Sequence, residues 1–194
     1  MAITLQPHSN QSVPAVRLAQ FDYNGALQDS GSGHPLIVIA VEHARIHEGR
    51  LFTGNKMWDS TAKVAAGASV DLMFTTSATK APHFIADIEA GGDAEIYIYE
   101  STQASGGTAV PMINRNRRSA TVSETIIVHS PTVTSVGTLI DASLLAGGGG
   151  KKSAGGSGGF GGEFVTAYST NYLIRVKNTS GAAQPINIIV WLYE

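Results

Sequence analysis

A two-residue alternation of apolar and polar side chains recurs in short segments along this chain. It is clearest near the C-terminal end, in the segments 172–177 and 186–193. The residues that share one face there are Tyr172, Ile174, Val176, Ile186, Ile188, Val190 and Leu192. A strand with one buried face has this period, whereas a buried helix face repeats every 3.6 residues. The alternation therefore predicts strands, and no helix of ordinary length is expected.

Further segments have the same character, and turn-forming residues separate them. Strands are predicted at 69–75, 83–89, 94–100, 123–129, 136–145 and 164–168, and the continuous apolar run 36–41 predicts a strand covered on both faces. Within each strand, the residues expected to point to the same face are Val70, Leu72 and Phe74; Phe84, Ala86 and Ile88; Ile96 and Ile98; and Ile126 and Val128. Residues 178–185 are predicted to join the last two strands as a hairpin loop.

The charged fraction is only 14%, and Gly, Ser, Thr and β-branched residues are abundant, which also favours an all-β protein. We predict an antiparallel β-sandwich of the jelly-roll type, with a barrel as the alternative. Residues 1–34 are predicted to form an N-terminal arm, either a frayed end or a segment that packs on a neighbouring subunit. Residues 35–194 are predicted to form the sandwich domain. The Gly-rich stretch 147–162 is predicted to be a flexible loop, either a solvated spacer or a loop ordered by a neighbour.

Composition excludes several functions. The chain has no cysteine, which rules out disulfides, thiolate catalysis and cysteine-based zinc sites. A net charge of -2 and a pI near 6.3 argue against a surface built for nucleic acid. No apolar run has the length of a membrane span, and the first residues lack the basic start and apolar core of a secretory signal. We expect a soluble protein made in a cytoplasm.

Catalytic motifs are missing from the sequence. No Gly-x-Ser-x-Gly elbow is present, so we predict neither an enzyme nor a cofactor. His43 and His47 are the best metal candidates, since residues four apart share a face of a strand. A third ligand is not identifiable, although Glu48, His83 or His129 are possible partners. No metal site is predicted, and the alternative is a pair of packed or hydrogen-bonded strand histidines.

The densest positive charge lies in the segment Asn114-Arg-Asn-Arg-Arg-Ser119. Three interpretations are open: a solvated loop, a protein interface in which arginine contacts carboxylates, and a nucleic-acid contact. The last has the least support, because three arginines stand in an acidic chain without an aromatic stacking platform.

Several motifs together resemble a family of tailed-bacteriophage virion proteins of the capsid decoration (cement) or head-fibre type. These motifs are Glu42-His-Ala-Arg-Ile-His-Glu-Gly-Arg-Leu-Phe52, Glu95-Ile-Tyr-Ile-Tyr-Glu100, Asn114-Arg-Asn-Arg-Arg-Ser119, Val128-His-Ser-Pro-Thr-Val-Thr134, Tyr172-Leu-Ile-Arg-Val-Lys-Asn178 and Trp191-Leu-Tyr-Glu194. The resemblance covers about residues 40–194, and Glu-His-Ala-Arg-Ile-His stands where the family has His-His-Glu-Ile-His. The resemblance implies a trimeric β-sandwich on the outside of an icosahedral head.

Three functional expectations remain, of which the resemblance implies the first. The first is a homotrimeric decoration protein on the capsid exterior, which binds the major capsid protein through Arg17, Asn114, Arg115, Arg117 and Arg118, with no nucleic-acid or membrane partner. The second is a tail or fibre adhesin that stacks a host-surface glycan on aromatic side chains, namely Tyr97, Tyr99 and Trp58. The third is a metal-dependent β-sandwich enzyme that uses the two histidines of the segment 43–47.

Overall fold

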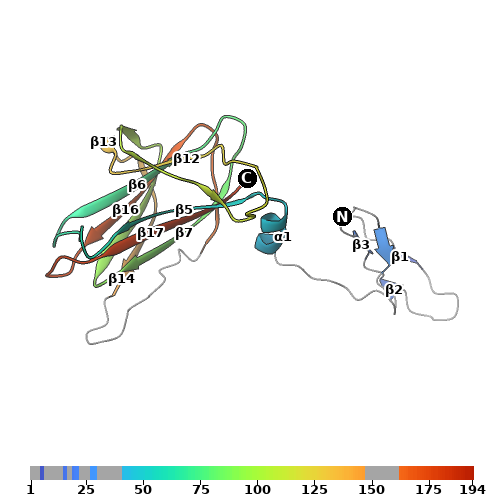
Figure 1. Ribbon diagram of the computed structural model, residues 1–194, viewed down its shortest axis with the longest axis horizontal. Helices are drawn as coiled ribbons and strands as arrows, with labels where there is room; N and C mark the ends of the chain where they lie inside the picture. Colours follow the sequence, from blue (N-terminus) through green and yellow to red (C-terminus); the bar gives the residue numbers. More distant parts are fainter. Residues whose placement is uncertain (1–4, 7–14, 17–18, 22–26, 30–40, 147–161) are drawn as a thin grey trace. The chain divides into compact units, whose positions relative to one another are not determined.

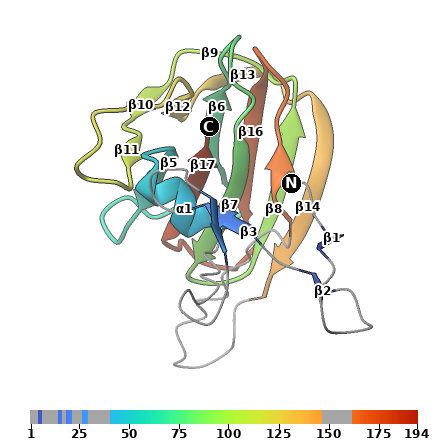
Figure 2. The same ribbon diagram turned by 90° about the vertical axis from the view of Figure 1, so that its right-hand side faces the viewer.

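The computed structural model describes residues 5–6, 15–16, 19–21, 27–29, 41–146 and 162–194 (Figures 1 and 2). The chain divides into two units, Met1–Val41 and Glu42–Glu194. In the first unit, β1 (Leu5–Gln6) pairs with β2 (Ala15–Val16), and β3 (Ala19–Phe21) pairs with β4 (Leu27–Asp29). Both pairs are antiparallel.

Three sequence predictions fall wholly or largely outside the described residues. Arg17 lies outside them, and so do residues 147–161 of the Gly-rich stretch. The predicted strand 36–41 lies outside them except for Val41, which is the first residue of a helix instead. The fold described below is therefore that of the second unit.

The second unit contains one short helix and thirteen strands among its described residues. The helix is α1 (Val41–His47), and the strands are β5 (Leu51–Trp58), β6 (Ser69–Thr75), β7 (His83–Ala90), β8 (Ala94–Glu100), β9 (Gln103–Ser105), β10 (Thr108–Val110), β11 (Ile113–Asn114), β12 (Ile126–His129), β13 (Thr132–Ser135), β14 (Thr138–Leu145), β15 (Phe164–Val165), β16 (Asn171–Asn178) and β17 (Ile186–Tyr193). The predicted all-β class is confirmed.

Two antiparallel sheets pack face to face as a sandwich, as predicted (Figure 1). The six-stranded sheet has the order β10-β12-β6-β16-β8-β14, and the five-stranded sheet has the order β11-β5-β17-β7-β15. Strands β9 and β13 form a separate pair. Consecutive strands β5, β6, β7 and β8 alternate between the two sheets, as do β14, β15, β16 and β17. Each sheet therefore interleaves strands from the two halves of the domain.

The predicted hairpin between the last two strands is wrong. β16 pairs with β6 and β8 in one sheet, whereas β17 pairs with β5 and β7 in the other. The connection crosses the end of the sandwich and is fixed by side chains: the Asn178 amide donates to the Val64 and Ala182 carbonyls, and the Gln184 amide donates to Asn178 Oδ1 and the Asp93 carbonyl. Alternation shows which face of a strand is buried but not which strand lies beside it.

The core lies between the inner faces of the two sheets, where the predicted alternating residues meet. Twelve of them are fully buried: Leu72, Phe74, Phe84, Ala86, Ile88, Ile96, Ile98, Ile174, Val176, Ile188, Val190 and Leu192. Phe74 and Phe84 cross the interface edge to face, with centroids 4.9 Å apart. In β12 the predicted pair Ile126 and Val128 does share a face, but Ile127 is the residue that is buried in the core.

The stretch that carries the two histidines is helical, which corrects the strand assumed for it. In α1, Arg45 Nη1 pairs with Glu48 Oε2 at 2.9 Å, three residues apart on the helix surface. Arg45 and His47 in the last turn suit the negative end of the helix dipole, and Gly49 with φ +70° ends the helix. The apolar alternation that marks strands begins only at Leu51.

Candidate interaction surface

The segment 114–119, called the Arg loop below, is held in place by asparagine side chains. Asn114 is buried at the end of β11, and its Nδ2 donates to the carbonyls of Gly49 and Thr121, each at 2.9 Å. Its Oδ1 accepts a hydrogen bond from the Asn116 backbone N–H at 2.9 Å. The predicted partner-binding residue Asn114 therefore supports the shape of the loop from inside.

A second asparagine joins the Arg loop to the helix. Asn116 Nδ2 donates to the His47 carbonyl at 3.0 Å, which satisfies a carbonyl at the end of α1. Its Oδ1 accepts from the Arg118 backbone N–H at 3.1 Å, and its carbonyl accepts from the Ser119 N–H at 3.0 Å. These bonds turn the backbone so that the loop closes within six residues.

The turn after α1 approaches the Arg loop so closely that it requires glycine. A Cβ built on Gly49 would lie 2.4 Å from Ser119 Oγ, and the positive φ of Gly49 is itself unfavourable for other residues. The sequence analysis missed this glycine. The only indication in the sequence is that Gly49 follows a helical segment, and that helix was not predicted.

The three arginines of the loop differ in their surroundings. The Arg115 guanidinium lies over the Trp191 ring, with its carbon 4.3 Å from the ring centroid, a cation–π contact to β17 of the same sheet that contains β11. Arg117 and Arg118 are exposed, and no described residue forms an ion pair with either. Two of the predicted interface residues thus present positive charge to solvent, with no ion-pair partner in the described part of the chain.

The outer face of the five-stranded sheet adjoins the Arg loop and mixes apolar side chains with polar ones. One row across it is Ile113, Thr53, Trp191 and Ile85, as the strand register shows. Exposed apolar side chains on the same face are Met57 (53% exposed), Ile113 (42%) and Val165 (66%). Trp191 joins the charged loop to this face, although sequence reasoning did not select it. The alternation in the sequence places Trp191 on the outer face of β17, but it does not show which residues lie beside Trp191.

A buried carboxylate secures the segment that follows the Arg loop. The Glu194 side chain is 1% exposed and accepts hydrogen bonds from Ser123 Oγ at 2.6 Å and from the Thr125 N–H at 3.1 Å. Burial alone raises the pKa of this carboxyl, but these bonds and one from the Glu124 N–H outweigh it, so the pKa lies below its ordinary value. Lys80 Nζ lies 3.5 Å away.

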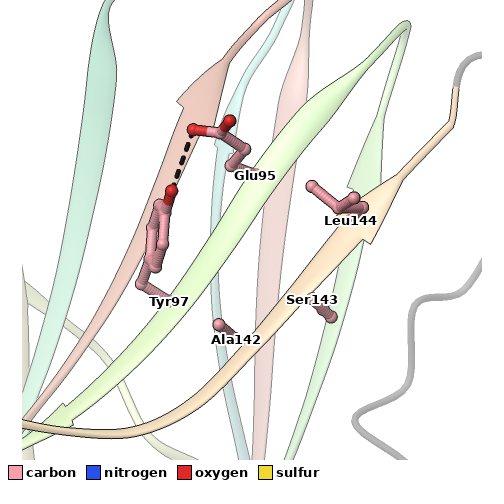
Figure 3. A pocket seen from close by; sticks show the side chains of 5 residues that line it. All are labelled: Glu95, Tyr97, Ala142, Ser143 and Leu144. Carbon is pink, nitrogen blue, oxygen red and sulfur yellow. Dashed lines mark hydrogen bonds between the residues drawn. The ribbon is translucent and has the colours of Figure 1, made fainter.

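The two candidate glycan-stacking tyrosines lie on the outer face of the six-stranded sheet. Tyr97 and Tyr99 stack with centroids 6.2 Å apart, and the Tyr97 hydroxyl donates to Glu95 Oε2 at 2.9 Å (Figure 3). This hydrogen bond, with one from Lys177, lowers the pKa of the Glu95 carboxyl. A shallow depression of about 210 Å³ adjoins them, lined by Glu95, Tyr97, Ala142, Ser143 and Leu144.

The third proposed stacking residue lies elsewhere. Trp58 belongs to β5 of the five-stranded sheet and meets the His129 ring edge-on, with centroids 6.1 Å apart. It therefore does not contribute to the depression beside Tyr97. Of the three aromatic side chains, only Tyr97 lines the depression, with Tyr99 stacked beside it.

The predicted partners of His43 and His47 do not join them in a three-ligand site. Glu48 pairs with Arg45, and His83 on β7 pairs with Glu163. His129 on β12 lies beside Ser130. Within the described part of the chain, no group of three or more His, Cys, Asp or Glu residues is placed to hold a metal ion.

Comparison with protein-family models, with curated proteins and with solved structures finds no match for this chain. In the part of the chain that the structure describes, no helix combines the length and hydropathy that crossing a bilayer requires.

Proposed function

We propose that this chain is a structural protein of a bacteriophage, which decorates and stabilises the outside of the icosahedral capsid by binding the major capsid protein. The observation that carries the proposal is the Arg loop: two exposed arginines with no ion-pair partner among the described residues, on a braced backbone, beside a sheet face that exposes apolar side chains. Arginine and aromatic residues with an apolar surround are the composition of protein interfaces. The resemblance of the sequence motifs to those of virion proteins suggests the kind of partner.

Preorganisation supports a binding role for this loop. Since Asn114 and Asn116 already fix its backbone, docking would order few further degrees of freedom, which lowers the entropic cost of association. The arginines suit carboxylates of the partner, and the outer face suits an apolar strip beside them. Arg17 belongs to the same proposal as a contact from the N-terminal arm.

We propose further that the sandwich is a jelly roll and that the protein is a homotrimer. The support for the jelly roll is the interleaved order of two sets of four strands, β5-β17-β7-β15 and β6-β16-β8-β14. A closed trimer would cover strand edges that otherwise invite aggregation. Native mass spectrometry should give three times the 20.3-kDa chain mass.

The binding test uses phage heads that lack this protein. Purified protein should co-sediment with them at fixed stoichiometry and raise their resistance to heat. The double variant Arg117→Ala/Arg118→Ala should bind at least tenfold more weakly, whereas Lys63→Ala, which removes an exposed charge elsewhere, should bind like the natural chain. A virion reconstruction that places the protein in the tail would contradict the proposal.

A second candidate function is glycan binding by a tail or fibre adhesin. The observation that favours it is the depression beside the stacked tyrosines, where Glu95 and Tyr97 offer polar atoms next to an aromatic face. On a glycan array, an adhesin should give reproducible hits that Tyr97→Ala abolishes and Trp58→Ala preserves. A decoration protein should give none.

A further inference from the structure

One face of α1 carries two imidazoles one helical turn apart. His43 Nε2 and His47 Nε2 lie 3.0 Å apart, and both residues are exposed. The ring centroids are 4.7 Å apart and the ring planes are inclined by 66°. The two nitrogens share a hydrogen bond, in which the N–H of one ring donates to the lone pair of the other. An ion bound to both nitrogens would take the place of the shared proton.

We propose that this histidine pair is a chelating site for a divalent transition-metal ion. Imidazole nitrogen binds such ions at about 2.0–2.1 Å. Two nitrogens 3.0 Å apart at that bond length subtend roughly 90° at the ion, the angle between neighbouring ligands in square-planar and octahedral complexes. A tetrahedral zinc ion would need a separation of roughly 3.4 Å. On this spacing we expect Cu²⁺ and Ni²⁺ to bind more tightly than Zn²⁺.

The positive charge on the helix itself is balanced, although the Arg loop that carries Arg117 and Arg118 is bonded to the His47 carbonyl through Asn116. The nearest basic residue of the same helix, Arg45, is neutralised by Glu48 at 2.9 Å, and the same carboxylate lies 3.9 Å from Arg50. Since the described residues offer no third ligand, the chain supplies two ligands and solvent fills the remaining positions.

Metal binding at this pair would stabilise the helix itself. α1 has seven residues, fewer than an isolated helix needs to persist in water. An ion held by residues four apart fixes one full turn, and the end of that turn is already tied to the Arg loop through Asn116 and the His47 carbonyl. The inference stands independently of the capsid proposal, because it rests only on the histidine geometry.

Calorimetric titration of the untagged full-length protein with CuCl₂, NiCl₂ and ZnCl₂ tests the site. One Cu²⁺ and one Ni²⁺ should bind per chain, and Zn²⁺ at least tenfold more weakly than Cu²⁺. Binding should fall at least tenfold in His43→Gln and in His47→Gln. The matched control replaces the other four histidines, His8, His34, His83 and His129, and should bind like the natural chain.

Two further readouts separate this site from non-specific binding. The electron paramagnetic resonance spectrum of the Cu²⁺ complex should show two equatorial nitrogens, and amide hydrogen exchange at residues 44–48 should slow on adding metal. Equal Cu²⁺ binding by the double variant His43→Gln/His47→Gln would overturn the proposal, as would unchanged exchange at saturating metal. Zinc binding as tight as copper binding would overturn the assigned geometry.

Discussion

Asn114 contributes to the surface by folding it, although the residue itself is buried. Its amide satisfies two carbonyls, one in the turn after α1 and one beyond the Arg loop, and its oxygen satisfies a backbone N–H. The segment 114–119 was predicted from sequence as a charged loop with a possible interface role. The positive charge of the loop could be predicted because it follows directly from the residue types. The support from the Asn114 side chain could not, since it depends on a hydrogen bond to Gly49, which is 65 positions away in the sequence.

Replacing this amide should destabilise the whole domain. Asn114→Ala removes three hydrogen bonds and leaves polar backbone groups unpaired, so we expect a loss of about 2–4 kcal/mol in the free energy of unfolding. Urea titration followed by tryptophan fluorescence measures it. Asn55→Ala, an exposed asparagine on β5, should change the free energy by less than about 0.5 kcal/mol. Similar losses for both variants would show that the brace is unimportant.

Gly49 is constrained in two separable ways. Gly49→Ala should cost about 1–2 kcal/mol for its left-handed backbone and more for the contact with Ser119. The double variant Gly49→Ala/Ser119→Gly should recover only the second part. Gly181→Ala, where nothing lies within 4 Å, is the control. Full recovery in the double variant would mean that the backbone conformation carries no penalty.

Among the elements, the strands were the most predictable part of this chain. β6, β7, β8, β16 and β17 lie within one or two residues of the predicted segments, because one buried face imposes the two-residue period. The strands β5, β9, β10, β11 and β13 and the helix α1 were missed. The short elements carry no complete period, and β5 alternates poorly in sequence because Leu51 and Phe52 are both buried and Gly54 and Lys56 follow at the alternating positions. Pairing with distant partners decides the conformation of these elements.

Adjacent residues of β17 provide a direct test of the two faces. Ile188→Ala removes a fully buried side chain and should cost about 2–5 kcal/mol, whereas Ile189→Ala on the outer face should cost less than about half as much. Chemical denaturation of the two variants measures the difference. Equal losses would contradict the assignment of the two sides of β17.

On the scale of the whole molecule, the strand partners follow an order that the sequence does not display. Strands close in sequence alternate between sheets, so their partners come from the other half of the domain. The wrong hairpin prediction for residues 178–185 arose there, because a short polar link between two alternating segments fits a hairpin and a crossover equally well. The fold class was predictable from sequence, and the connectivity was not.

Acid should weaken the domain through Glu194, which joins segments from several elements. Because its folded pKa is lowered, the ionised carboxylate stabilises the fold above the ordinary value of about 4.5, and this contribution is lost as the pH falls through the lowered pKa. Glu194→Gln should therefore be less stable than the natural chain at pH 7. The difference should shrink towards pH 3 in urea titrations, and a difference independent of pH would contradict this account.

The direct pairing of Leu51 with Tyr193 has a mechanical consequence. β5 and β17 are antiparallel neighbours, so residues 51 and 193 lie at the same end of their shared hydrogen-bond ladder. A force that pulls these two residues apart would break the interstrand hydrogen bonds one after another from that end. A force along the strands in opposite directions would load all of these hydrogen bonds together. If the protein holds a pressurised shell together, its resistance to rupture would therefore depend on whether the load pulls these two strand ends apart or acts along the strands.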